Sequence, residues 1–155
     1  MNSLELNDNQ KAKLVDAFAE VAVLIGSADG KMSDEEKEWS HKVSHIRTFA
    51  GKEELFDLYK EVENTIDDKI NRILTSYPDL EKREHKLIES LEGVNDVLAK
   101  LDSHVGSLIY KDLRSFAKHV AKASGGFLRF FSISRDEREW AELPMINEII
   151  WEEEA

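Results

Sequence analysis

Three oxygen-bearing side chains, Asp29, Ser33 and Glu36, have the spacing of the second half of a calcium-binding loop within the stretch "SADGKMSDEEKEW". If Gly30 is the glycine that such a loop needs at its position 6, these three residues stand at positions 5, 9 and 12. Position 1, normally an aspartate, is then Ile25, whose side chain cannot ligate a metal. A complete EF-hand loop is therefore excluded. We expect at most a weakly held, hydrated divalent cation, Ca²⁺ or Mg²⁺, at Asp29, Ser33 and Glu36.

The same residues also suit a turn between two helices. Gly30 can adopt the left-handed conformation that ends a helix, and Ser33 can accept a hydrogen bond from the free N–H groups that open the next one. Glu36, three residues later, completes a capping box. A helix cap and a metal site are compatible, and the sequence leaves both open.

A second group of candidate side chains is basic. Lys111, Arg114, Lys118 and Lys122 share one face of an expected helix, and Arg129 follows in the linker "GGFLRFF". In a chain with a net charge of -11, this basic stripe is a candidate contact surface for an anionic partner or a phosphate group. The alternative is a solvated face, or pairing with acidic residues elsewhere in the chain. The aromatic residues of the linker are a further candidate contact surface for a protein or a membrane.

The composition limits the class of protein that carries these candidates. With 155 residues, 41% hydrophobic and 34% charged, the chain suits one soluble domain with a real core. It has no cysteine, which excludes disulfides, thiolate zinc sites and cysteine nucleophiles. The acidic balance disfavours nucleic acid as a partner, because phosphate would be repelled at long range.

The sequence also bears on where the protein is located and on whether it is an enzyme. The start "MNSLELNDNQ" does not have the pattern of a secretory signal, and no run of about 18 apolar residues predicts a transmembrane segment. We therefore expect a cytoplasmic protein, with peripheral membrane contact left open. No nucleophile elbow, P-loop or dinucleotide fingerprint occurs, so we expect no enzymatic activity.

The elements that must position the candidate residues are all helical. Apolar residues recur with the helical period, no segment alternates as a strand would, and two prolines and seven glycines are few. We expect an all-α bundle of six or seven helices. The predicted helices span 10–28, 33–50, 53–75, 80–102 and 108–123, and a last one begins after 134 and is bent or restarted at Pro144. The helices before Gly30 and Gly125 are the most continuously apolar, so we expect them to pack centrally.

Two segments of the chain resemble each other. "SDEEKEW" at 33–39 matches "SRDEREW" at 134–140, including Trp39 and Trp140, and each copy follows an apolar helix that ends in small residues. The match predicts two pseudo-repeated helix–turn–helix units that flank a long middle pair of helices.

An apolar helix that ends in "ADGKMSDEE", followed much later by a second small-residue turn and an S-x-x-E helix start, resembles the TerB-like family, named for tellurite-resistance protein B. The resemblance implies a single all-α domain over residues 1–155, without known enzymatic activity in most members. It also implies a link to bacterial stress, tellurite resistance and phage phenotypes, and divalent metal binding by the acidic motif residues, here Asp29 and Glu36. The second copy, "ASGG", has no aspartate.

Two classes of function follow. The first is a non-enzymatic bacterial stress-response protein of TerB-like type, which binds a divalent metal weakly and acts through protein partners. The second is a metal-free helical protein-interaction module that uses the basic helix face or the aromatic linker.

Overall fold

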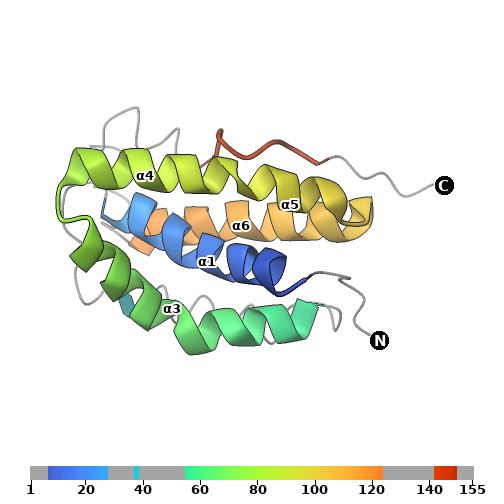
Figure 1. Cartoon of the computed structure of the whole chain (residues 1–155), viewed down its shortest axis with the longest axis horizontal. Coiled ribbons are helices and arrows are strands. Elements are labelled where there is room, and N and C mark those ends of the chain that lie inside the picture. Colours follow the sequence, from blue (N-terminus) through green and yellow to red (C-terminus); the bar gives the residue numbers. More distant parts are fainter. Residues whose placement is uncertain (1–6, 28–36, 39–54, 124–141, 150–155) are drawn as a thin grey trace.

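The computed structural model describes residues 7–27, 37–38, 55–123 and 142–149. Within these residues the chain forms helices and no strand, so the prediction of an all-α fold is confirmed. The helices are α1 (Asp8–Gly26), α3 (Phe56–Ser76), α4 (Leu80–Glu92), α5 (Val94–Lys100) and α6 (Ser103–Ala123) (Figure 1). Most of 33–39 and all of 134–140 lie outside the described residues, so the repeat and the total of six or seven helices stay predictions.

Helix α1 is the centre of the bundle. It contacts α3, α4, α5 and α6, and Figure 1 shows it between α3 on one side and the α4–α5 pair on the other. From Val21 to Gly26 every residue is buried, because the sequence there is apolar around the whole circumference of the helix. A capping box between Asn7 and Gln10 starts the helix. The predicted central position of this helix is confirmed.

Three aromatic rings join α1 to its two largest neighbours. Phe18 of α1 packs edge-on against Tyr59 of α3, with ring centroids 5.6 Å apart, and against Phe116 of α6, 5.5 Å apart. The Tyr59 hydroxyl donates a hydrogen bond to Asp112 of α6. The ring of Phe18 therefore contacts both α3 and α6, and these contacts hold the two helices against α1.

The turn from α3 to α4 depends on a buried cation. Arg83 is only 2% exposed, and its Nη1 donates to the carbonyl of Tyr77, 2.9 Å away, at the end of α3. Asp79 caps α4 by accepting a hydrogen bond from the Lys82 N–H at 3.0 Å. Pro78 precedes this capping residue.

Three predictions about individual helices were wrong. The single helix expected over 80–102 is interrupted at Gly93 and forms α4 and α5. Helix α6 begins at Ser103 rather than at 108, because Asp102 Oδ2 accepts hydrogen bonds from the N–H groups of His104 and Val105. The helix expected around Pro144 is not found in 142–149, which form turns, a bend and irregular backbone.

Gly106 allows α6 to approach both α5 and the segment that contains Ile149. A β-carbon at this position would lie 3.2 Å from the Leu98 carbonyl oxygen in α5 and 3.2 Å from Cδ1 of Ile149. The backbone carbonyl cannot move aside as a flexible side chain can. Gly93 differs only in part. A β-carbon there would lie 3.2 Å from the flexible end of Lys13 and also 3.2 Å from the Ser90 carbonyl oxygen, which is three residues earlier along helical backbone with φ -65° and ψ -18° at Gly93.

We predict that Gly106→Ala destabilises the protein by about 1–2 kcal/mol, because overpacking outweighs the better helix propensity of alanine. Gly93→Ala is the matched control and should be close to neutral, because the near contact with the Ser90 carbonyl opposes the gain in helix propensity, while the end of Lys13 can move aside. Urea denaturation of the two variants measures both effects. Equal midpoints for the two variants would contradict the close approach at Gly106.

Candidate functional site

The candidate residues from the sequence are only partly described by the structure. Asp29, Ser33 and Glu36 lie outside the described residues, as does Arg129. Three members of the basic stripe, Lys111, Arg114 and Lys118, are described on α6, and the helix also includes Lys122, whose side chain is not described. Within the part of the chain that is described, no three acidic or histidine side chains come together as a metal site would require.

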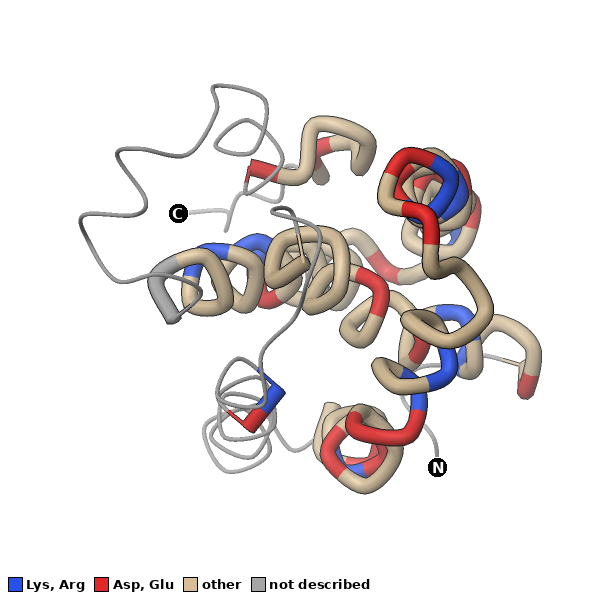
Figure 2. The backbone as a smooth tube through the Cα atoms, turned by 90° about the vertical axis from the view of Figure 1, so that its left-hand side faces the viewer, with Lys and Arg blue, Asp and Glu red and all other residues tan. Residues whose placement is uncertain are grey.

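The basic stripe holds a carboxylate of the chain itself. Arg114 donates a hydrogen bond from Nη2 to Oε2 of Glu142, and Nζ of Lys118 lies 3.6 Å from Oε1 of the same carboxylate. In Figure 2 the basic positions of α6 lie on the side of the helix that faces segment 142–149. The sequence left pairing with distant acidic residues open, and Arg114 and Lys118 pair in this way.

The electrostatics of this contact follow from its geometry. The hydrogen bond from Arg114 lowers the pKa of Glu142 below its usual value, and the same bond raises the pKa of Arg114. Glu142 is therefore ionised at neutral pH. Because its side chain is 52% exposed, solvent screens the pair, and its contribution to stability is small.

Tyr110 and Lys111 lie beside the residues that hold Glu142. The guanidinium of Arg114 lies over the ring of Tyr110, with Cζ 5.6 Å from the ring centroid, which orients the planar fork that carboxylates prefer. Lys111 is exposed and has no ion pair with any residue that the structure describes. The described part of the stripe thus contains one occupied carboxylate position and, at Lys111, a further exposed ammonium group.

Residues 142–149, which we call the C-terminal strap, lie against α5 and α6. Leu143 and Ile146 are buried, at 0% and 3% exposure. Asn95 of α5 donates from Nδ2 to the Met145 carbonyl at 3.0 Å, and its Oδ1 accepts from the Asn147 N–H at 2.7 Å. Sequence analysis missed this contact, because a single asparagine on a helix gives no signal of a distant partner.

A second polar cluster lies where α1, α3 and α4 meet. Lys13 donates to Ser90 Oγ at 3.1 Å, and Ser90 donates to Glu20 Oε2 at 2.6 Å. The other carboxylate oxygen of Glu20 is buried and has no hydrogen-bond partner in the described part of the chain. Beside it, Lys69 and Asp16 form an ion pair. A cavity of about 130 Å³ adjoins the cluster and is lined by Asp16, Ala19, Glu20, Lys69, Arg72 and Ile73.

Burial dominates the chemistry of Glu20. Desolvation raises its pKa above the ordinary 4.5, although the Ser90 hydrogen bond and the charge of Lys13 act in the opposite direction. Sequence analysis also missed this cluster. The available signal was an acidic residue inside the apolar run "AFAEVAVLIG".

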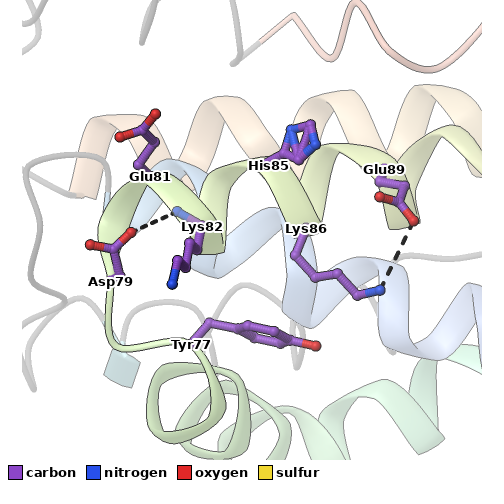
Figure 3. A pocket seen from close by; sticks show the side chains of 7 residues that line it. All are labelled: Tyr77, Asp79, Glu81, Lys82, His85, Lys86 and Glu89. Atoms are coloured by element: carbon purple, nitrogen blue, oxygen red, sulfur yellow. Dashed lines mark hydrogen bonds and ion pairs between the residues drawn. The ribbon is translucent and has the colours of Figure 1, made fainter.

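An open hollow of about 690 Å³ lies along the outer side of α4 (Figure 3). Lys82 and Lys86 extend toward the ring of Tyr77, whereas Glu81 and His85 lie on the other side of the helix. Lys86 is 4.0 Å from Glu89. The lining contains Asp79, Glu81 and Glu89 beside the two lysines, so its charges favour neither an anion nor a cation.

Comparison of the chain with family models, curated proteins and solved structures found no match. The resemblance to the TerB-like family therefore rests on the motif in the sequence. In the described residues, none of the helices has the length and apolarity to cross a membrane.

We predict that the free energy of unfolding contains a pH-dependent contribution from Glu20. Because its folded pKa is raised, the folded state binds a proton more tightly than the unfolded state, so this stabilisation is full below the unfolded pKa, near 4.5, and is lost as the pH rises through the folded pKa. Glu20→Gln should remove this loss, so that the variant gains stability relative to the wild type between acidic and neutral pH.

Urea denaturation across that pH range measures the difference. Glu89→Gln, a substitution of an exposed carboxylate on α4, is the matched control and should follow the wild-type pH dependence. Parallel curves for Glu20→Gln and the wild type would contradict the prediction.

Proposed function

We propose that this protein is a non-enzymatic interaction module that binds an acidic segment of a protein partner through the basic face of α6. One observation carries the proposal: Arg114 and Lys118 together bind the carboxylate of Glu142. A surface that holds one carboxylate in this way has the chemistry to hold a similar one from another protein.

The charge of the chain supports a local and selective contact. With a net charge of -11 the protein repels acidic molecules at long range, so an acidic partner gains attraction only where basic groups are clustered. Lys111, exposed on the same helix, extends this cluster beyond the Glu142 position. Nucleic acid is not part of the proposal, because its dense phosphate charge would meet the acidic remainder of the surface.

The stress-response function of TerB-like proteins remains a second proposal. It is favoured by the spacing of Asp29, Ser33 and Glu36, which supplies half of a calcium loop. It is compatible with the first proposal, since both act through a protein partner and differ in whether a divalent cation is bound.

For the basic face, we predict that a peptide of six glutamates shifts the amide NMR signals of α6 between Lys111 and Lys118. Lys118→Gln should weaken this binding up to about fivefold, the effect of losing one exposed ion pair. Lys86→Gln removes the same charge from α4 and should leave the affinity unchanged. Shifts confined to α4, or equal losses in both variants, would contradict a specific site on α6.

For the metal, we predict weak binding of Ca²⁺ or Mg²⁺, with a dissociation constant of roughly 10⁻⁴ to 10⁻³ M, because the loop supplies few of the six or more oxygen ligands that calcium prefers. Calorimetric titration of the metal-free protein measures this affinity. Asp29→Asn should abolish the binding heat, whereas Asp68→Asn, an exposed site on α3, should preserve it. If the heat of binding is unaffected by Asp29→Asn, the proposed ligands are wrong.

A further inference from the structure

We propose that the C-terminal strap is a built-in ligand of the α5–α6 surface, and that an acidic segment of a protein partner, in the same turn conformation, binds there by displacing it. This inference rests on the proposed function, and it adds both the form of the partner segment and a device that regulates access to the site.

The first argument is that Asn95 recognises main chain. Its amide donates to the Met145 carbonyl and accepts from the Asn147 N–H. These two groups flank Ile146, whose own N–H donates to the Leu143 carbonyl at 3.0 Å, so Asn95 holds the main chain of the strap where it leaves a turn. Because these bonds involve no side chain of the strap, a segment with a different sequence that forms the same turn can make them equally well.

The second argument is that acidic and apolar side chains follow one another in a fixed order along the strap. Glu142 binds Arg114 and Lys118, Leu143 and Ile146 are buried, and Ile149 approaches Gly106 of α6. The surface thus fits an acidic residue followed by apolar residues one, four and seven positions later. Its basic and apolar parts are adjacent, so a partner segment needs both kinds of side chain in this order.

The third argument is that the strap is held in a conformation its sequence disfavours. Leu143 has a φ of 52°, a left-handed conformation that is unfavourable for a residue with a β-carbon. Such a residue persists only where the surrounding contacts impose it, and it is common in elements that switch. The strap therefore binds less tightly than its buried area alone would give, which makes displacement by a partner feasible.

The connection to the rest of the chain makes the strap a competitor. Residues 124–141 join it covalently to α6, so its binding to the α5–α6 surface is intramolecular and is favoured by a high effective concentration. A free segment with the same contacts must overcome this concentration. Weakening the strap without changing α5 or α6 should therefore increase the affinity for the free segment.

The test uses the full-length chain and a fluorescently labelled peptide with the sequence of residues 141–150, "AELPMINEII". Glu142→Gln combined with Ile146→Ser removes the carboxylate and one buried anchor from the strap and leaves the α5–α6 surface intact. We expect this loosened chain to bind the peptide at least tenfold more tightly than the wild type does. Glu148→Gln is the matched control, because it changes an exposed charge of the strap, and its affinity should equal that of the wild type.

A third variant locates the binding site. Asn95→Ala added to the loosened chain should remove the gain in affinity, because the main-chain hydrogen bonds to the peptide are lost. If the double substitution unfolds the protein, as circular dichroism would show, Glu142→Gln alone provides the comparison, with a smaller gain of a few-fold expected.

Equal affinity of the wild-type and loosened chains for the peptide would overturn the strap as a regulator. The proposed function would stand in that case if the six-glutamate peptide still bound α6. If neither peptide binds any variant, both proposals fail. Concentration-dependent dimerisation of the loosened chain in light scattering, with no peptide bound, would also overturn the inference, because the occupant would then be a second copy of this chain.

Discussion

The packing of Phe18 between Tyr59 and Phe116 joins the three longest described helices. This contact is possible because α1 is apolar on all sides in its second half and can be surrounded by other helices. A helix of this kind must be covered completely, so the rest of the bundle is arranged around it. The candidate surface on α6 depends on the same contact, since Phe116 faces α1 while Arg114 and Lys118 lie toward the strap.

Charged side chains occur inside this arrangement as well as on its surface. Arg83 binds a helix-terminal carbonyl, and Glu20 is held by Ser90 with one oxygen unpartnered in the described part of the chain. The first contact completes hydrogen bonds that the end of α3 cannot make alone. The second leaves a carboxylate in an environment that favours its neutral form. The buried Arg83 and the partly buried Glu20 thus have different consequences, one structural and one dependent on pH.

The function proposed for the α6 surface would let an acidic protein present a site for an acidic ligand. Its basic groups are concentrated on one helix face, and the carboxylate bound there comes from the strap, 28 positions after Arg114 in the chain. Asn95 fixes the strap through main-chain bonds, and Leu143 adopts a left-handed conformation within it. In the proposed function, binding and regulation would therefore involve the same few contacts, and a partner that reproduces them would compete directly with the strap.

By itself the sequence determined the helical class, the central position of α1 and the bounds of α3 to within a few residues, because hydrophobic periodicity is a local property of the chain. It also predicted that basic residues line one face of α6. The interruption at Gly93 and the early start of α6 at Ser103 were not predicted, since the apolar pattern continues past Gly93 and the cap from Asp102 is a local hydrogen bond rather than a periodic pattern.

Only the tertiary structure decided that Glu142 meets Arg114, that Asn95 holds the strap and that Ser90 reaches Glu20. These contacts join residues 28 to 70 positions apart, and their formation depends on how the helices pack, which no local pattern in the sequence specifies.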